Sequence, residues 1–115
     1  MIVQVRPADL AAWLQSVASD AAALPVVLDV REPWELQTAS VQPAGFRLVP
    51  IPMGDVPARL SELDPDTPIA CLCHHGARSL RVAAFLAQNG FDPVANIHGG
   101  IEAWSGELDP AVPRY

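Results

Sequence analysis

The sequence contains no lysine, and all seven of its basic residues are arginines. Chemistry that needs a lysine is therefore excluded, including Schiff-base catalysis and a Walker-type phosphate-binding loop. The formal net charge is −6, so we expect neither nucleic acid nor an anionic membrane as a partner. Because the whole molecule weakly repels an anionic substrate, any attraction of such a substrate must come from local groups.

The chain also lacks any apolar run close to the ~20 residues that a transmembrane helix needs. Its first residues do not combine a charged start with a long apolar stretch, so no signal peptide is visible. We therefore expect a cytoplasmic protein, unless a transit segment has been removed. With 115 residues, half of them apolar, the chain is predicted to form one domain with its own packed core.

There are two cysteines, Cys71 and Cys73, and a single residue separates them. On a strand they would lie about 6.6 Å apart, which is a poor span for a disulfide. We predict that Cys71 packs as a small core residue. The alternative, that Cys71 is a resolving thiol for an oxidised Cys73, requires the end of the strand to move.

Residues 68–79 are the stretch in which we predict a functional site. Residues 69–72 form a short apolar run that is typical of a buried strand, and a helical apolar pattern is under way by Leu80. Gly76 permits a tight turn between the two. Such a turn directs backbone N–H groups and the positive end of a helix dipole at one place, where an anion can bind. Cys73 stands at the head of this turn, and Arg78 closes it.

Helix N-termini and nearby cations favour the thiolate form of a cysteine, so we predict that Cys73 is a nucleophile. The alternative is an inert cysteine buried at the end of a core strand. Arg78 offers a fork of donors suited to a sulfonate-like group, but it could instead pair with a carboxylate on the helix surface. The two histidines either add positive charge near neutral pH or only shape the entrance. The predicted substrate-binding residues are His74, His75, Gly76, Ala77 and Arg78.

Three segments together resemble the rhodanese-like sulfurtransferases. Residues 73–79, Cys-His-His-Gly-Ala-Arg-Ser, resemble the active-site loop of this family, in which a cysteine and the next five residues form a cradle. Residues 29–35, Asp-Val-Arg-Glu-Pro-Trp-Glu, resemble the signature after its second strand, and residues 99–104, Gly-Gly-Ile-Glu-Ala-Trp, its closing signature. The order and approximate spacing match, so the resemblance covers nearly the whole chain. Residues 39–45 depart from the usual Gly-His-Ile-Pro-Gly-Ala segment.

The resemblance implies a thiosulfate sulfurtransferase that works through a persulfide on Cys73. A donor such as thiosulfate would give its outer sulfur to Cys73 and release sulfite, and cyanide or a thiol, including the thiol of a protein, would accept that sulfur. Because sulfite leaves as a stable anion, the reaction demands no general acid. This chemistry calls for no cofactor and no metal.

Three alternatives remain open from the residues themselves. A cysteine phosphatase loop usually has five residues between Cys and Arg, whereas this loop has four, and no acid for the leaving group is apparent. A non-catalytic sulfur-binding or interaction module of the same fold would need neither Cys73 nor Arg78. A metal site built from Cys71, Cys73, His74 and His75 is disfavoured, because metal motifs usually space their ligands by two or more residues.

Strands and helices alternate along the chain, which predicts an α/β domain of three layers, with a parallel sheet of about five strands between helices. The strands are predicted at residues 2–5, 26–30, 48–51, 69–72 and 93–97. The helices are predicted from Pro7 to an end within residues 21–25, and at 33–37, 55–63, 79–89 and 101–104. The rhodanese-like domain is expected to span residues 1–106, and residues 107–115 are expected to form a loose tail.

Asp29 interrupts the second predicted strand, and a buried acid needs a partner, for which Arg31 is a candidate. Ligands of α/β sheets bind beyond the carboxyl ends of the strands, so both residues are expected near Cys73. They either brace the active loop or form a structural ion pair. Trp34, a few residues later, is expected to pack against a strand end.

Overall fold

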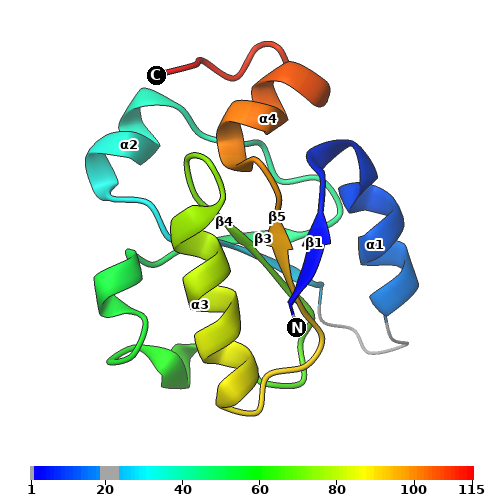
Figure 1. The fold of residues 1–115 in the computed structure, drawn as a ribbon, viewed down its shortest axis with the longest axis vertical. Coiled ribbons are helices and arrows are strands. Elements are labelled where there is room, and N and C mark those ends of the chain that lie inside the picture. The colour runs from blue at the N-terminus through cyan, green and yellow to red at the C-terminus, as the bar shows by residue number, and fades with distance from the viewer. Residues whose placement is uncertain (1, 19–23) are drawn as a thin grey trace.

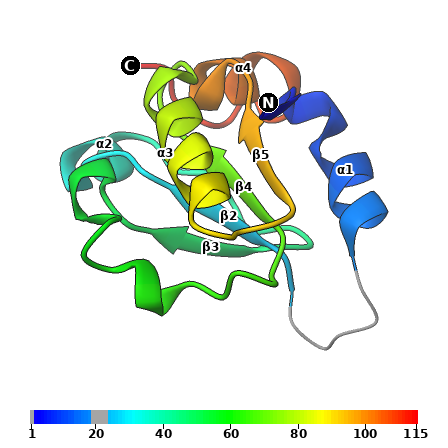
Figure 2. The same cartoon turned by 60° about the horizontal axis from the view of Figure 1, so that its bottom comes forward.

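The structure is a computed structural model that describes residues 2–18 and 24–115 (Figures 1 and 2). The described residues form one sheet of five parallel strands in the order β1-β5-β4-β2-β3. The strands are β1 (Val3–Val5), β2 (Val26–Asp29), β3 (Arg47–Pro50), β4 (Ile69–Leu72) and β5 (Val94–Ile97). The α/β fold with a parallel central sheet is therefore confirmed, and β3 lies at one edge of the sheet.

Helices cover both faces of this sheet. They are α1 (Leu10–Val17), α2 (Pro33–Thr38), α3 (Ala77–Gln88) and α4 (Gly100–Glu107), with short 3-10 turns η1 (Pro7–Asp9), η2 (Met53–Asp55) and η3 (Leu60–Glu62). One core cluster joins Leu14 of α1 and Trp104 of α4 to one face of the sheet. A second cluster joins Leu86 of α3 to the other face. In Figure 1, α1 and α3 accordingly lie on opposite sides of the strands.

The two central strands β2 and β4 are buried along their whole length. Their continuous apolar sequence suits this position, since a parallel strand between two helical layers has no face in water. α3 ends where Gly90 takes a positive φ of 86°, which a residue with a β-carbon resists. The sheet and α3 thus form a rigid base for the loop between β4 and α3.

Residues 55–63 do not form the predicted helix. The segment contains η2 and η3 with a turn between them, and the N–H of Arg59 contacts the carbonyls of both Asp55 and Val56. A helix this short has little intrinsic stability, and 3-10 turns can satisfy the same backbone groups. The apolar positions still serve the core, because Val56 and Leu63 are buried.

The prediction that Trp34 packs against a strand end is wrong, because this side chain is 61% exposed. Neighbouring helix residues point about 100° apart, and α2 turns Glu35 rather than Trp34 towards the interior. The Trp34 ring instead meets the edge of the Tyr115 ring, with centroids 6.0 Å apart.

Residues 107–115 are not a loose tail. Val112 is buried in the cluster that contains α1 and α4, and its carbonyl accepts the hydroxyl of Ser105 at 2.7 Å. Tyr115 reaches back to the end of the sheet that carries the predicted site. The proposed domain boundary at residue 106 stays a prediction.

Other element ends differ by a few residues. α4 is longer than predicted and reaches Glu107, while α1 ends at Val17. The predicted end of that first helix, within residues 21–25, lies mostly outside the described residues. Among the described residues, no helix has both the length and the apolar character needed to cross a membrane.

Candidate active site

The loop between β4 and α3 contains the predicted nucleophile. β4 lies beside β2, so the loop and the residues after Asp29 meet at the carboxyl end of the sheet, as expected. Gly76 precedes α3 with a φ of 107°, and a β-carbon there would lie 3.1 Å from the backbone nitrogen of Gly99. The positive φ therefore favours glycine at this position, and the close approach leaves little room for a β-carbon.

The Cys73 sulfur lies at the floor of this loop, and the residue is 1% exposed. Its Sγ accepts the backbone N–H of Gly76 at 3.1 Å and lies 3.2 Å from the Ser79 hydroxyl oxygen. One N–H at the start of α3 is thus directed at the sulfur. The nucleophilic role of Cys73 stays a prediction.

A polar chain fixes Ser79 behind the sulfur. Its hydroxyl lies 2.5 Å from Asn96 Oδ1, and the Asn96 amide nitrogen donates to the Gly76 carbonyl at 3.1 Å and to Gln4 at 2.8 Å. These two acceptors orient the Asn96 amide, so its oxygen faces Ser79. The single hydroxyl proton of Ser79 can be given to either Asn96 or Cys73, but not to both at once.

The first turn of α4 holds the loop from the other side. Ile101 donates its N–H to the carbonyl of Cys73 at 2.9 Å, and Glu102 donates to the carbonyl of His74 at 3.1 Å. Gly100 lies so close that a β-carbon would overlap both carbonyls. The Gly99-Gly100 pair therefore marks a close approach of two backbone segments.

Cys71 is fully buried among apolar side chains, as predicted. Both cysteines are free thiols. Burial raises the pKa of the Cys71 thiol, and the neighbouring Cys73 adds to this effect. Cys71 is therefore held in its unreactive form.

Arg78 pairs with a carboxylate, which was the alternative to binding a sulfonate-like group in the sequence analysis. Its two terminal nitrogens bind the two carboxylate oxygens of Glu35 at 2.7 and 2.8 Å. The Glu35 carboxylate also accepts the Tyr115 hydroxyl at 2.7 Å and the Glu32 N–H at 3.1 Å. Hydrogen bonds from Arg78 above all lower the pKa of Glu35 to about 2.

Asp29 and Arg31 form a fully buried ion pair with two hydrogen bonds, at 2.9 and 2.7 Å. Arg31 also donates to the Glu35 carbonyl at 3.3 Å and to the Tyr115 hydroxyl at 3.1 Å. The pair thus contacts the segment that carries Glu35, and through Glu35 it is linked to Arg78. The ion pair is thus structural, and its role in bracing the active loop stays a prediction.

The two loop histidines stack with Tyr115. The His74 ring lies between the rings of His75 and Tyr115, each with its centroid 3.9 Å away. Burial lowers the pKa of His74, and the neighbouring His75 lowers it further. This shift favours the neutral form of His74, and the role of the two histidines at the entrance stays a prediction.

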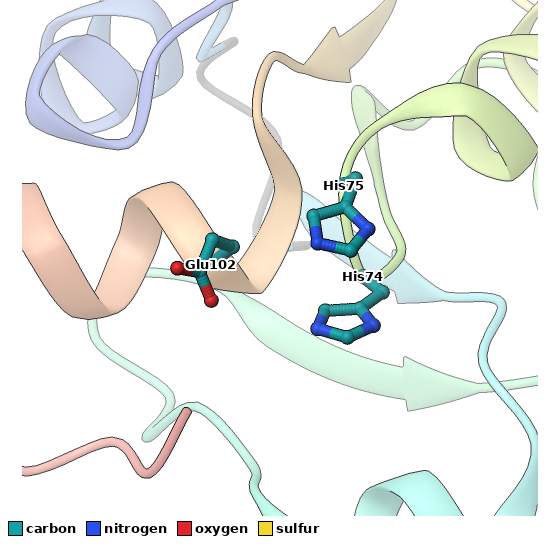
Figure 3. A group of neighbouring side chains, drawn as sticks. All are labelled: His74, His75 and Glu102. Carbon is teal, nitrogen blue, oxygen red and sulfur yellow. The ribbon is translucent and has the colours of Figure 1, made fainter. Parts of the chain in front are cut away.

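A potential metal cluster combines the two histidines with Glu102 of α4, and their ligand atoms lie within 4.8 Å of one another (Figure 3). This group, found among the described residues, contains neither cysteine of the metal alternative drawn from the sequence. The two imidazole rings are within 20° of parallel, so their in-plane lone pairs run side by side rather than converging on one ion. The stacked arrangement does not suit a metal centre.

Sequence reasoning missed five residues of this site. Glu35 and Ser79 were present in the quoted motifs, and Asn96 stood out as a polar residue within an apolar strand, so a signal existed for each. Gln4 and Tyr115 lie far from these motifs in the chain, and only the fold brings them to the loop.

In this structure a buried cysteine stands at the head of a short loop between a central parallel strand and the N-terminus of a helix. This arrangement places the protein in the class of α/β proteins with a cysteine-based site. The chain matches the rhodanese-like domain family over residues 7–107 and belongs to that family.

Relatives support this assignment. The chain is 38% identical over 84 residues to the putative sulfurtransferase YtwF of Bacillus subtilis, covering 73% of this chain and 77% of that protein. It is 41% identical over 91 residues to the rhodanese-like/PpiC domain-containing protein 12 of Arabidopsis thaliana chloroplasts, covering 77% of this chain but 30% of that protein. The chain therefore spans less than a third of the plant relative.

A solved structure has the same fold over nearly the full length. The rhodanese-related protein from Thermoplasma volcanium is 31% identical, with a TM-score of 0.75, and the match covers 98% of this chain and 99% of that one.

Proposed function

We propose that this protein is a sulfurtransferase that moves sulfane sulfur from a donor to a thiophilic acceptor through a persulfide on Cys73. The observation that carries the proposal is the contact of the Cys73 sulfur with the Gly76 N–H at the start of α3. The family and the relative named a putative sulfurtransferase support sulfur transfer as the general activity.

With thiosulfate as donor, the Cys73 thiolate attacks the outer sulfur. The S–S bond of thiosulfate breaks, a new S–S bond to Cys73 forms, and sulfite leaves with the bonding electron pair. Cyanide then attacks the outer sulfur of the persulfide, which releases thiocyanate and regenerates the thiolate. A thiol acceptor, either a small molecule or a protein, would take the sulfur by the same displacement.

The loop backbone has the main stabilising role in this proposal. N–H groups of residues 74–78 would surround the outer sulfur of the persulfide, as the donors of an oxyanion hole surround an oxygen. The Asp29–Arg31 pair would keep the Glu35 segment in place. The cytoplasmic location, the identity of the acceptor and the use of thiosulfate as a donor all stay predictions.

Intact-mass measurement tests the proposal directly. The wild type and Cys73→Ser are incubated with thiosulfate without reductant, and then with cyanide. The wild type should gain the mass of one sulfur atom and lose it to cyanide as thiocyanate, whereas the variant should gain nothing. A wild type that gains no sulfur from thiosulfate or from any other sulfane donor would contradict the proposal, and aryl phosphates would then be tested as substrates.

A further inference from the structure

The Arg78–Glu35 pair removes the free positive charge that the end of the loop would otherwise offer. The side chain of Glu35 is 4% exposed, and that of Arg78 is 35% exposed. The carboxylate is held by Arg78, the Tyr115 hydroxyl and the Glu32 N–H. With so many donors, Glu35 stays ionised and in place at any pH above strongly acidic values.

The groups around the loop do not replace the positive charge of Arg78 that Glu35 neutralises. Among the residues that the structure describes, Arg31 is fully paired with Asp29, and His74 is shifted towards its neutral form by burial. Glu102 lies beside the two histidines, and its carboxylate is paired with Arg114 at 3.5 Å, so this neighbouring arginine is paired as well. Positive potential at the loop therefore comes from backbone N–H groups and the start of α3, which suit a small charge better than a double one.

We propose that Glu35 determines the class of sulfur donor, and that by neutralising Arg78 it favours donors with at most one negative charge, such as the persulfide of a thiol, over doubly charged thiosulfate. This inference rests on the proposed function. The carboxylate at the loop repels thiosulfate more strongly than a singly charged donor, because electrostatic energy scales with the charge of the ligand.

The transfer step itself is the same for such a donor. The Cys73 thiolate attacks the outer sulfur of R–S–SH, the donor S–S bond breaks, and the new S–S bond forms on Cys73. The thiolate RS⁻ leaves with the electron pair and takes a proton from water. No oxidant or reductant is consumed, since a sulfane sulfur passes from one sulfur atom to another.

Two donors of matched chemistry test the role of Glu35. Thiosulfate carries two negative charges, whereas the methanethiosulfonate anion carries one, and both give up an outer sulfur to a thiolate. Replacing Glu35→Gln should raise kcat/KM roughly tenfold for thiosulfate and about threefold for methanethiosulfonate, as the charge ratio requires. An equal change for both donors, or a loss with thiosulfate, would overturn the inference.

The chain supplies matched controls. Glu62 forms a similar two-bond pair with Arg59, but the pair is exposed and lies outside the loop. Glu62→Gln changes the net charge equally and should leave both donors unaffected. The double variant Glu35→Gln/Arg78→Gln removes both charges of the pair and should restore the wild-type ratio of kcat/KM between the two donors.

The wild type alone provides a second test if the variants fail to fold. Added salt screens the repulsion, so kcat/KM for thiosulfate should rise relative to methanethiosulfonate as the salt concentration increases. A relative fall would overturn the role of Glu35 while leaving sulfur transfer intact. If neither donor produces a Cys73 persulfide, the proposed function fails, and the inference fails with it.

Discussion

Ile101 donates its backbone N–H to the carbonyl oxygen of Cys73 at 2.9 Å. The first turn of α4 therefore fixes the peptide group that follows the nucleophile. This contact is possible because Gly100, with a φ of 60°, lets α4 approach the loop without a side chain between them.

Gly100→Ala should disrupt the site. Its β-carbon would overlap the carbonyls of Cys73 and His74, and the positive φ adds strain on the order of 1–3 kcal/mol. We expect a lower free energy of unfolding in urea and slower persulfide formation. Gly54→Ala is the control, because a β-carbon at Gly54 meets no heavy atom within 4 Å. Wild-type stability and rate in Gly100→Ala would show that the contact has no role.

Ser79→Ala should slow persulfide formation about tenfold, because it removes the hydroxyl that lies 3.2 Å from the Cys73 sulfur and can turn its proton from Asn96 to that sulfur during the reaction. The measurement is the rate of sulfur uptake by mass spectrometry across a range of pH. Ser105→Ala is the control, since it also removes a buried hydroxyl hydrogen bond, but from α4 to Val112. Both variants should lose about 1 kcal/mol of stability, and Ser79→Ala alone should lose activity.

Replacing each cysteine by serine should show that Cys73 serves the activity and Cys71 the stability. Cys73→Ser is expected to abolish sulfur transfer and keep the fold. Cys71→Ser places a hydroxyl at a fully buried apolar position, which costs about 1–3 kcal/mol, while transfer continues. Urea unfolding and sulfur uptake, measured on both variants, check this division. Equal loss of activity in a well-folded Cys71→Ser would contradict it.

Glu35 should make stability depend on pH in the acid range. Its pKa falls from 4.5 to about 2 on folding, so the folded state favours the carboxylate. The resulting stability, on the order of 3 kcal/mol, is fully present above pH 4.5 and is lost as the pH falls towards 2.

Urea unfolding at several pH values between 6 and 2 measures this loss. The Glu35→Gln variant should show a smaller decline than the wild type, because its amide does not titrate. Glu62→Gln, which changes an exposed pair, should decline as the wild type does. A parallel decline in all three proteins would show that Glu35 contributes no pH dependence.

The parts of the fold that follow from local patterns were predictable. The apolar runs at residues 26–30 and 69–72 predicted the central strands, and Gly76 and Gly90 marked the start and end of α3. Residues 55–63 were misassigned, because apolar spacing alone does not separate a short helix from two 3-10 turns. Local sequence therefore predicted the scaffold better than its irregular connections.

The site was predictable only in part, because some of its contacts join segments that are distant in the sequence. Cys73 and the loop glycine stood within one motif, but the partner of Arg78 lies more than forty positions away in sequence, on α2. Tyr115 joins the network from a segment without any apparent motif. Pairings between distant segments depend on the packing of the whole domain, which periodicity does not encode.

The anchoring of the loop also bears on how this site can be redesigned. The loop shape is held by backbone contacts from α4 and by Asn96, and these contacts do not depend on the side chains at positions 74, 75 and 77. Libraries that vary only these three positions would therefore explore new donors and acceptors on an unchanged frame. Directed evolution of specificity should start at these three positions and keep Gly76 and Gly100 unchanged.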